Sequence, residues 1–175
     1  MKTLILYTSK YGATKKYADL LAAELSCEAE ETKRADIAKV MQYDTIILGG
    51  GIYAGGIAGL SFIKKNYERL KAKKLIVFAV GASPHDETAI QELRKRHFTG
   101  DLEAVQCFYC RGAWNEDVMT LRDRLLCSML KKAVAKKDPA HYDPWEAALM
   151  QAMGSKCDWT DKMYLEPIIK LARTV

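Results

Sequence analysis

Four short apolar runs are spaced along the chain, and each is followed closely by a glycine or a threonine. The runs are Thr3–Tyr7, Thr45–Leu48, Leu75–Val80 and Ala104–Tyr109. Within each run the apolar residues are nearly continuous instead of alternating with polar ones. Such runs are typical of strands that are covered on both faces, as in a parallel sheet between two layers of helices. We therefore predict four buried parallel strands.

Between these runs, apolar residues recur at the spacing of a helix. Helices are predicted over residues 13–25, 60–70 and 87–96. A weaker strand is expected over Glu28–Thr32, because the chain must return from the first helix before the next strong strand begins. Strands that alternate with helices in this way are typical of a doubly wound α/β domain, here with a five-stranded parallel sheet.

The chain continues beyond the fifth strand for longer than this architecture requires. One closing helix over residues 162–173 would complete the cover of the sheet, which leaves residues 113–157 unassigned. Apolar residues at helical spacing predict two helices in this surplus, over 116–136 and 144–153. We expect a single domain, residues 1–175, that carries residues 113–157 as a helical insertion after its fifth strand.

The composition suits a single domain. The 175 residues are 49% hydrophobic, which is enough for one well-buried core. No apolar stretch reaches the length of about 18 residues that a membrane-spanning helix needs, and the run after Lys2 is too short for a signal peptide. We expect a cytoplasmic protein, with peripheral contact to the inner face of the membrane as an alternative.

Five cysteines, an odd number at irregular spacing, argue against a disulfide framework. Cys107 and Cys110 form a C-x-x-C pattern, which suggests thiol redox chemistry. On a strand, however, residues three apart point to opposite faces, and their Cα atoms lie about 10 Å apart, beyond the roughly 7 Å that a disulfide spans. We therefore expect free cysteines, with this pair in the core.

Positive charge is concentrated in one segment of the predicted insertion. The chain carries a formal charge of +5, and the segment from residue 122 to residue 137 alone holds an excess of that size. Its charged residues are Arg122, Arg124, Lys131, Lys132, Lys136 and Lys137, against Asp123. Two roles are open for the helix over 116–136. It makes peripheral contact with an anionic membrane surface, or it is an ordinary cover helix whose apolar face packs on the body.

The loop after the first strand is rich in short hydrogen-bonding groups. Thr8, Ser9, Gly12 and Thr14 stand between the strand and the first helix. The free N–H groups and the dipole of a helix N-terminus favour an anion, and these hydroxyls add donors around it. A capping loop is the alternative, although three hydroxyls exceed what one cap needs. From the residues alone, we favour a phosphate site.

Other phosphate motifs do not fit this chain. A P-loop requires G-x-x-x-x-G-K-[ST], but Gly56, which follows Gly51 at the right interval, precedes Ile57 and not a lysine. The segment from Gly49 formally matches G-x-G-x-x-G/A. No acid stands about 20 residues later, however, where a dinucleotide site needs one. The first loop is therefore the better candidate.

The first loop, T-S-x-x-G-x-T, resembles the FMN phosphate loop of flavodoxins. The order of elements, the glycine-rich segment after the third strand and Gly81-Ala82-Ser83 after the fourth extend the resemblance. It implies a flavodoxin-like fold, with strand order 2-1-3-4-5, and FMN as the cofactor. The residues implied to hold the phosphate are Thr8, Ser9, Lys10, Gly12, Ala13 and Thr14. Those implied to flank the flavin ring are Gly50, Gly51, Ile52, Tyr53, Ala54, Gly55, Gly81, Ala82, Ser83 and His85, with Tyr53 as the best candidate to stack on it.

The surplus segment carries a second, looser resemblance. A basic insertion in this position, followed by Asp158-Trp159, is similar to that of menaquinone-dependent protoporphyrinogen oxidases of the flavodoxin type. The two resemblances imply a redox partner protein or a quinone as the partner. A flavin-free interaction module on the same fold is the alternative from another class. We expect no nucleic-acid partner, no metal site and no catalytic acid, base or nucleophile among the side chains.

Overall fold

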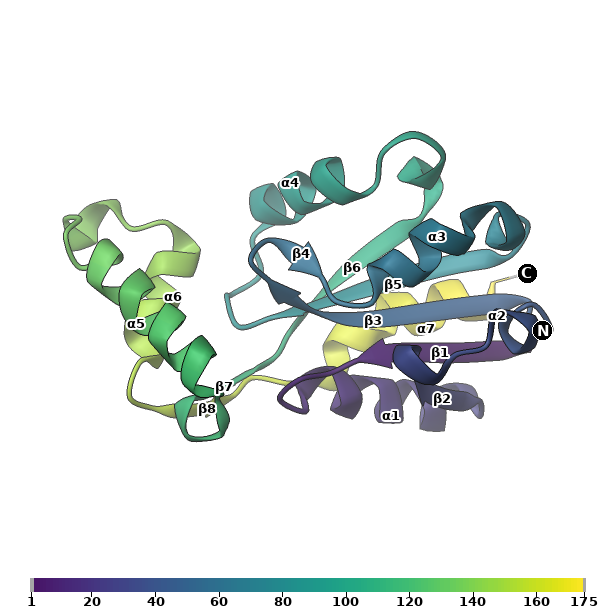
Figure 1. The fold of residues 1–175 in the computed structure, drawn as a ribbon, viewed down its shortest axis with the longest axis horizontal. Helices are drawn as coiled ribbons and strands as arrows, with labels where there is room; N and C mark the ends of the chain where they lie inside the picture. The colour runs from purple at the N-terminus through teal and green to yellow at the C-terminus, as the bar shows by residue number, and fades with distance from the viewer. Residues whose placement is uncertain (1, 175) are drawn as a thin grey trace.

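Five parallel strands form the centre of the fold (Figure 1). The computed structural model describes residues 2–174. Its central strands are β1 (Thr3–Thr8), β2 (Glu28–Glu31), β3 (Thr45–Tyr53), β5 (Lys74–Gly81) and β6 (Gln106–Arg111). They lie in the order β2-β1-β3-β5-β6, which confirms the predicted sheet and its order. The register sets Leu6 beside Leu48, and Leu48 beside Val77.

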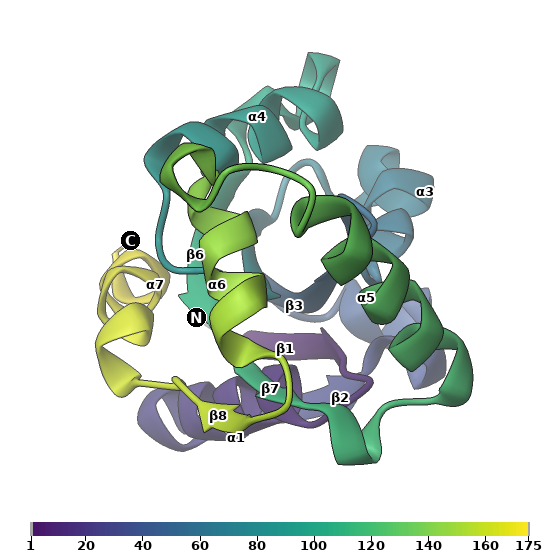
Figure 2. The same ribbon diagram turned by 90° about the vertical axis from the view of Figure 1, so that its left-hand side faces the viewer.

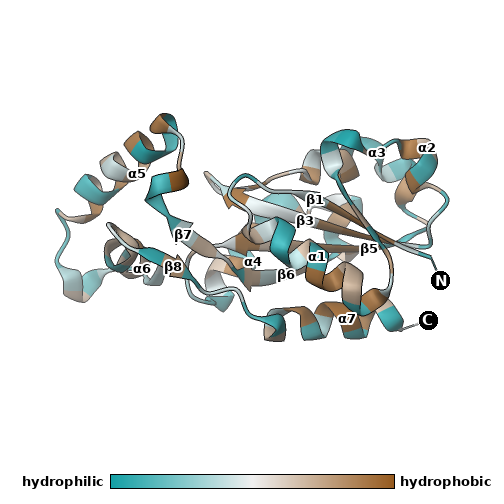
Figure 3. Cartoon of the chain, turned by 90° about the horizontal axis from the view of Figure 1, so that it is seen from below, coloured by the Kyte–Doolittle hydropathy of each residue, from teal (hydrophilic) through white to brown (hydrophobic). Residues whose placement is uncertain are grey.

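Helices cover both faces of this sheet (Figures 1 and 3). One face carries α1 (Ala13–Leu25) and α7 (Glu166–Arg173), and the other carries α2 (Ile37–Val40), α3 (Leu60–Leu70) and α4 (Glu87–His97). Successive residues of β1 alternate between the two cores: Leu4 and Leu6 pack on the α3 side, whereas Ile5 and Tyr7 pack on the α1 side. Both faces of the strand are buried, which is why its apolar run is continuous.

The C-x-x-C pair lies on β6 and divides between the two cores. Cys107 packs in the core on the α3 side, and Cys110 packs in the core on the α1 side. The two thiols therefore lie on opposite faces of the strand, as predicted, and they are free. Burial raises the pKa of both thiols, so they are protonated core side chains at neutral pH.

β3 is longer than predicted. The apolar run ends at Leu48, but the strand continues through three glycines to Tyr53. Glycine is required in this segment because a Cβ atom at Gly49 would lie 2.1 Å from the ring of Phe78, on the neighbouring strand. The predicted end of the strand is therefore wrong, because glycines that make room for a neighbour look the same in the sequence as glycines that break a strand.

A tight hairpin follows β3. Its two turn residues, Ala54 and Gly55, have positive φ angles of 47° and 74°, as the primed turns of two-residue hairpins require. The chain then forms the short strand β4 (Gly56–Ile57), which pairs antiparallel with the end of β3. The predicted glycine-rich loop is thus a buried strand end followed by a turn.

Three other boundaries differ from the prediction. A 3₁₀ turn over Gly100–Ala104 precedes β6, so that this strand begins at Gln106. The first helix of the insertion, α5 (Leu121–Val134), begins later than predicted because Thr120 caps it, accepting a hydrogen bond from the third N–H of the helix (3.2 Å). The last helix begins only at Glu166, after a further 3₁₀ turn.

The insertion stands beyond the carboxyl ends of the strands (Figures 1 and 2). It contains α5 and α6 (Pro144–Ala152), which contact each other. A two-stranded antiparallel stem, β7 (Ala113–Asn115) and β8 (Lys156–Asp158), joins them to the body, and the sequence pattern does not predict it. The interpretation of α5 as an ordinary cover helix is wrong, because Val134 is the one buried residue of this fully described helix.

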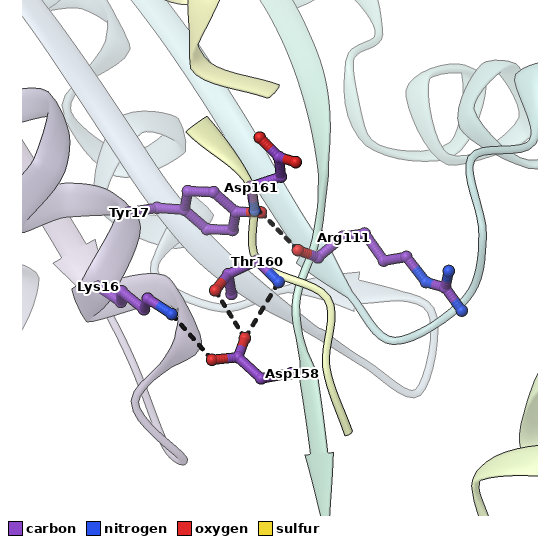
Figure 4. A network of polar contacts seen from close by, with 6 residues as sticks. All are labelled: Lys16, Tyr17, Arg111, Asp158, Thr160 and Asp161. Carbon is purple, nitrogen blue, oxygen red and sulfur yellow. Dashed lines mark hydrogen bonds and ion pairs between the residues drawn. The ribbon is translucent and has the colours of Figure 1, made fainter. Parts of the chain in front are cut away.

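Polar contacts attach the stem to α1 (Figure 4). The buried side chain of Tyr17 donates its hydroxyl to the carbonyl of Arg111 (2.5 Å) and accepts from the N–H of Asp161 (3.0 Å). Beside it, Lys16 forms an ion pair with Asp158 (2.8 Å). The segments that enter and leave the insertion are therefore both bonded to the helix that follows the first loop.

Candidate functional site

The β1–α1 loop presents backbone donors at an open surface. Ala13 begins α1, and Gly12, at a φ of 97°, is its N-cap. Within the described residues, this N-terminus has no side-chain cap and no acidic residue in its first turn. A Cβ atom at Gly12 would meet no described atom within 4 Å. The helix N-terminus therefore faces open space, and its N–H groups are available to an anion.

Two hydroxyl-bearing residues of the loop, Ser9 and Thr14, lie at this N-terminus. Ser9 is half-buried, and its Oγ accepts a hydrogen bond from the N–H of Gly12 (3.2 Å). Thr14 is buried in the first turn of α1. Thr8 is half-buried beside Gly59, where any larger residue would meet its Oγ1. The structure thus brings the predicted phosphate-binding residues together, and their part in binding FMN stays a prediction.

The insertion reaches this loop through Asp123, in the first turn of α5. The carboxylate accepts hydrogen bonds from Lys10 and from the hydroxyl of Tyr11. The Tyr11 oxygen in turn accepts from the N–H of Thr120 (3.2 Å). These contacts lower the pKa of Asp123, chiefly through the hydrogen bond from Lys10. A charged carboxylate of the insertion therefore lies beside the predicted phosphate site.

A cavity of about 620 Å³ lies beside the loop that follows β5. Five of the residues predicted to flank the ring line it, namely Ile52, Gly55, Gly81, Ala82 and Ser83. Its other walls come from α4, from Tyr109 on β6, and from Pro144 and Trp145 at the start of α6. The second helix of the insertion thus closes one side of the cavity, whose volume lies within the range of small-molecule sites.

Side chains of β6 hold the loop after β5 in place. Tyr109 donates its hydroxyl to the carbonyl of Ser83 (2.5 Å), and Arg111 donates its Nε–H to the carbonyl of Ala82 (3.3 Å). The exposed ring of His85 meets that of Tyr109 edge-on, with 6.2 Å between the ring centroids. Burial raises the pKa of Tyr109, so its hydroxyl remains a donor.

The β3–β4 turn lies between the first loop and the cavity. The ring of Tyr53, 41% exposed, lies 5.6 Å from the Nζ of Lys10. On the other side of the turn, the Nε2 of His97 on α4 hydrogen-bonds the carbonyl oxygen of Gly55. Ala54 is exposed at the tip. The turn is therefore tied both to the predicted phosphate loop and to the helix that lines the cavity.

Five of the residues predicted to flank the ring do not line this cavity, and their part in binding the ring stays a prediction: Gly50, Gly51, Tyr53, Ala54 and His85. Gly50 and Gly51 are buried in β3 and, in the described structure, form no part of the cavity wall. A Cβ atom at Gly50 would lie 2.1 Å from the carbonyl oxygen of Ala58, and one at Gly51 would lie 2.8 Å from the ring of Tyr53. Both glycines therefore serve the close packing of the hairpin.

Sequence reasoning missed Tyr109, Asp123 and Pro144 as residues of this site. No sequence pattern indicates that the hydroxyl of Tyr109, at the end of an apolar run, belongs to the site. Asp123 carried one signal, because it is the single acid among the cations between residues 122 and 137. Among the tryptophans, Trp145 lines the cavity, whereas the ring of Trp159 stacks on an arginine guanidinium at 4.2 Å.

Comparison with protein families supplies an independent result. A family model described as "Flavodoxin domain" matches residues 4–141. The match includes the first loop, the hairpin turn, the loop after β5 and α5, and it ends before α6. A comparison with curated protein sequences gave no significant match.

Several solved structures are similar to the chain at low identity. The two-electron reduced flavodoxin of Megasphaera elsdenii is 18% identical, with 61% of this chain and 82% of that chain covered and a TM-score of 0.46. Oxidised flavodoxin 2 of Bacillus cereus is 23% identical, with 67% and 90% covered and a TM-score of 0.41. A flavoprotein of Lactobacillus acidophilus in complex with FMN is 22% identical, with 63% and 91% covered and a TM-score of 0.40.

Proposed function

Because the chain belongs to the flavodoxin domain family, we propose that it binds FMN without a covalent bond and works as an electron carrier or oxidoreductase. The observation that carries this proposal is the pairing of two sites around the β3–β4 turn. An open helix N-terminus with its hydroxyls suits a phosphate, and a cavity of about 620 Å³ suits a planar ring. FMN carries both groups.

The residues present fit the two ends of such a cofactor. Thr8, Ser9 and Thr14 offer hydroxyls, Lys10 offers a positive charge, and the first turn of α1 offers free N–H groups. At the other end, a Cβ atom at Gly81 would lie 2.9 Å from the hydroxyl of the neighbouring tyrosine. Glycine at that position therefore keeps the cavity wall open for a ring.

When bound, FMN supplies one- or two-electron chemistry, and the protein supplies binding, orientation and electrostatics. Tyr109 and Arg111 hold the carbonyls of the loop after β5 in fixed positions at the cavity. Pro144 and Trp145 close the cavity from the side of the insertion. The loop after β5 thereby orients the ring, and the start of α6 shields the open part of the cavity from water.

Titration of the purified chain with FMN tests the proposal. We expect the fluorescence of the flavin to fall and its absorbance spectrum to shift as the ring enters the cavity. If fluorescence and absorbance both stay unchanged, the chain does not bind FMN. A flavin-free interaction module on the same fold is then the better description.

A matched pair of variants tests the position of the phosphate. Ser9→Glu places a carboxylate at the N-terminus of α1 and should weaken FMN binding roughly 100-fold, because it repels the phosphate. Ser61→Glu makes the same change on the exposed surface of α3 and should leave the affinity unchanged. Riboflavin, which lacks the phosphate, should bind Ser9→Glu as it binds the parent chain. Equal FMN affinities of the parent chain and Ser9→Glu would place the phosphate elsewhere.

A quinone-dependent oxidase of the protoporphyrinogen type is a second candidate. It is favoured by the apolar residues around the cavity, which is lined by Pro144 and Trp145 of the insertion together with Ile90 and Leu93 of α4. Such walls suit a flat apolar molecule beside the flavin. Flavin-loaded protein should then form porphyrin from protoporphyrinogen with a quinone as acceptor. Absence of turnover removes this candidate.

Variants at Trp145 refine this test. Trp145→Ala removes the aromatic wall and should raise the KM for the apolar substrate roughly tenfold. Trp145→Phe keeps an aromatic ring and should stay within about threefold of the parent value. The affinity for FMN, measured in parallel, should be the same in both variants. A fall in FMN affinity would instead assign Trp145 to the flavin itself.

A further inference from the structure

Most of the large apolar side chains that the structure exposes lie on α5. Nine such side chains are exposed in the described chain, and five of them belong to this helix. They are Leu121, Leu125, Leu126, Met129 and Leu130, which are 83%, 62%, 53%, 59% and 47% exposed, and we call them the α5 face. Figure 3 shows apolar residues along this helix. Contiguous exposure of this kind marks an interaction site.

α5 uses its opposite side for contact with the protein. Asp123, Cys127 and Val134 are less exposed than the α5 face, and their spacing of four and seven residues places them on one side of the helix. Asp123 contacts the first loop, and α5 contacts α6. Leu121, Leu125 and Met129, spaced by four residues, lie on the opposite side, away from these contacts, whereas Leu130 lies beside Val134. The helix stands at the end of the molecule that the insertion forms (Figure 2).

Free cations accompany the α5 face. Within residues 2–174, no carboxylate oxygen lies within 4.0 Å of the side-chain nitrogens of Arg122, Lys131, Lys132 or Lys136. Lys132 continues the row of the helix that contains Leu125 and Met129, because the three residues are spaced by four and three. The apolar row therefore lies on the same side as Arg122, Lys132 and Lys136.

Two of the six cations in this segment are already engaged. Lys137 forms an ion pair with the buried Glu146 (2.6 Å). Arg124 donates a hydrogen bond to the carbonyl of Glu116 (2.8 Å). The remaining four are available to an anionic partner.

A second copy of this chain is a poor occupant of the α5 face. Two such faces packed on each other would bring both sets of free cations together, and like charges across an interface are unfavourable. The single acid of the helix, Asp123, is bound to Lys10 and cannot offset them. An anionic surface, by contrast, attracts the same cations.

We propose that α5 docks on the surface of an anionic lipid membrane. The helix lies in the plane of the surface, with the α5 face among the headgroups and with Arg122, Lys132 and Lys136 beside the lipid phosphates. Interfacial helices insert their apolar side about 5–10 Å deep, and the 14 residues of α5 give a contact about 21 Å long. In the described chain, no helix is long and apolar enough to cross a bilayer.

Co-sedimentation of the full chain with lipid vesicles tests the proposal. We expect binding to vesicles of phosphatidylcholine mixed with phosphatidylglycerol, and much weaker binding to phosphatidylcholine alone. Binding should fall as the salt concentration rises from about 0.01 M to about 0.15 M, because the screening length shortens from roughly 30 Å to roughly 8 Å. The proposal is overturned if the chain stays in the supernatant with both kinds of vesicle, or binds both equally.

Two double variants separate the apolar part from the electrostatic part. Leu125→Gln with Met129→Gln should weaken vesicle binding by roughly tenfold or more, because apolar surface no longer enters the membrane. Lys132→Gln with Lys136→Gln should weaken it about 30-fold, since each cation contributes about one kcal/mol at an anionic surface. All four side chains are exposed, so both variants should keep the fold and the FMN affinity of the parent chain.

Matched controls lie on other elements. Met163→Gln replaces an exposed methionine in the 3₁₀ turn before α7, and Lys64→Gln with Lys65→Gln neutralises two exposed lysines on α3. Both controls should bind vesicles as the parent chain does. Equal loss in controls and α5 variants overturns the assignment to α5. The proposal is also overturned if the parent chain is a dimer in solution and the double variant of Leu125 and Met129 is a monomer, because the α5 face would then join two copies.

Discussion

Asp123, in the first turn of α5, forms an ion pair with Lys10, which lies 113 positions earlier in the β1–α1 loop. The contact joins the insertion to the loop that the sequence predicts to hold a phosphate. Because a bound phosphate would use the same cation, the carboxylate of Asp123 and the phosphate compete for Lys10. We therefore expect the insertion to be coupled electrostatically to phosphate binding at the loop.

This competition predicts the effect of Asp123→Asn on cofactor binding. The variant removes a negative charge beside the phosphate and should raise the affinity for FMN by about fivefold at low ionic strength. The gain should shrink as salt is added, because both charges are near the surface. Fluorescence titration with FMN at two salt concentrations measures it.

Riboflavin is the control for this prediction. It has the same ring as FMN without the phosphate, so its affinity should be equal for the parent chain and for Asp123→Asn. An equal gain for both ligands would mean that the variant acts by loosening the insertion and not through charge. A loss of FMN affinity would show that the contact with Lys10 supports the site.

A second prediction concerns the wall of the cavity at Gly81. Gly81→Ala places a methyl group 2.9 Å from the hydroxyl of Tyr109 and 3.3 Å from the Cδ1 of Ile52, so the wall must shift. We expect FMN affinity to fall roughly tenfold, because the ring loses its fit. Gly56→Ala is the matched control, since its methyl group meets its nearest neighbour at an ordinary 3.5 Å. Titration of both variants should separate them, and equal affinities would remove Gly81 from the ring site.

The close packing inside β3 gives a third prediction. Gly49→Ala would drive a methyl group into the ring of Phe78 at 2.1 Å and should destabilise the fold by about 1–3 kcal/mol. Phe78→Leu removes the ring and should cost stability by itself. The double variant should lose less stability than the sum of the losses in the two single variants, because the leucine makes room for the methyl group. Urea unfolding of the four chains measures the coupling, and strict additivity would contradict the clash.

The stem contact between Lys16 and Asp158 predicts a dependence on pH (Figure 4). The hydrogen bond from Lys16, with further bonds from Thr160, lowers the pKa of Asp158 to about 2. A carboxylate whose folded pKa lies below its usual value of about 3.9 stabilises the fold above that value. This stabilisation is lost as the pH falls from about 4 to about 2.

Asp158→Asn tests this dependence. Because the Asp158 side chain is 57% exposed and screened by solvent, the variant should lose less than about 1 kcal/mol at neutral pH. The difference between the two chains should shrink as the pH falls towards about 2 and vanish below it, where the parent carboxyl becomes protonated as well. Urea unfolding at several pH values measures it. A difference that is the same at neutral and acidic pH would contradict the role of the charge.

Local patterns were sufficient for much of this fold. The continuous apolar runs that include Ile5 and Val77 predicted strands buried on both faces, because every position of such a strand meets a core. The hydroxyls around Gly12 predicted a loop with donors at a helix N-terminus, because that arrangement depends only on neighbours in the sequence. The two cysteines of the C-x-x-C pattern were placed on opposite faces by the period of a strand alone.

The predictions were wrong where the structure of a residue depends on contacts with residues far away in the sequence. The glycines from Gly49 onward read as a loop, but Phe78 on the next strand makes them part of β3. The stem of the insertion was not predicted, because each of its strands is too short to show the alternation of apolar and polar residues that marks a strand. Each strand is stabilised by pairing with the other. The apolar residues of α5 read as a covering face, and only the packing shows them exposed.

Local patterns in the chain were enough to predict the parallel sheet and the donor-rich first loop, and the family resemblance implied the strand order. Each of these rests on residues close together in the chain. The placement of the insertion over the carboxyl edge of the sheet, with Asp123 at the first loop and Trp145 at the cavity, becomes visible only in the folded chain. These contacts depend on the orientation in which the stem is bonded to α1, and the hydrophobic periodicity of the sequence does not indicate that orientation.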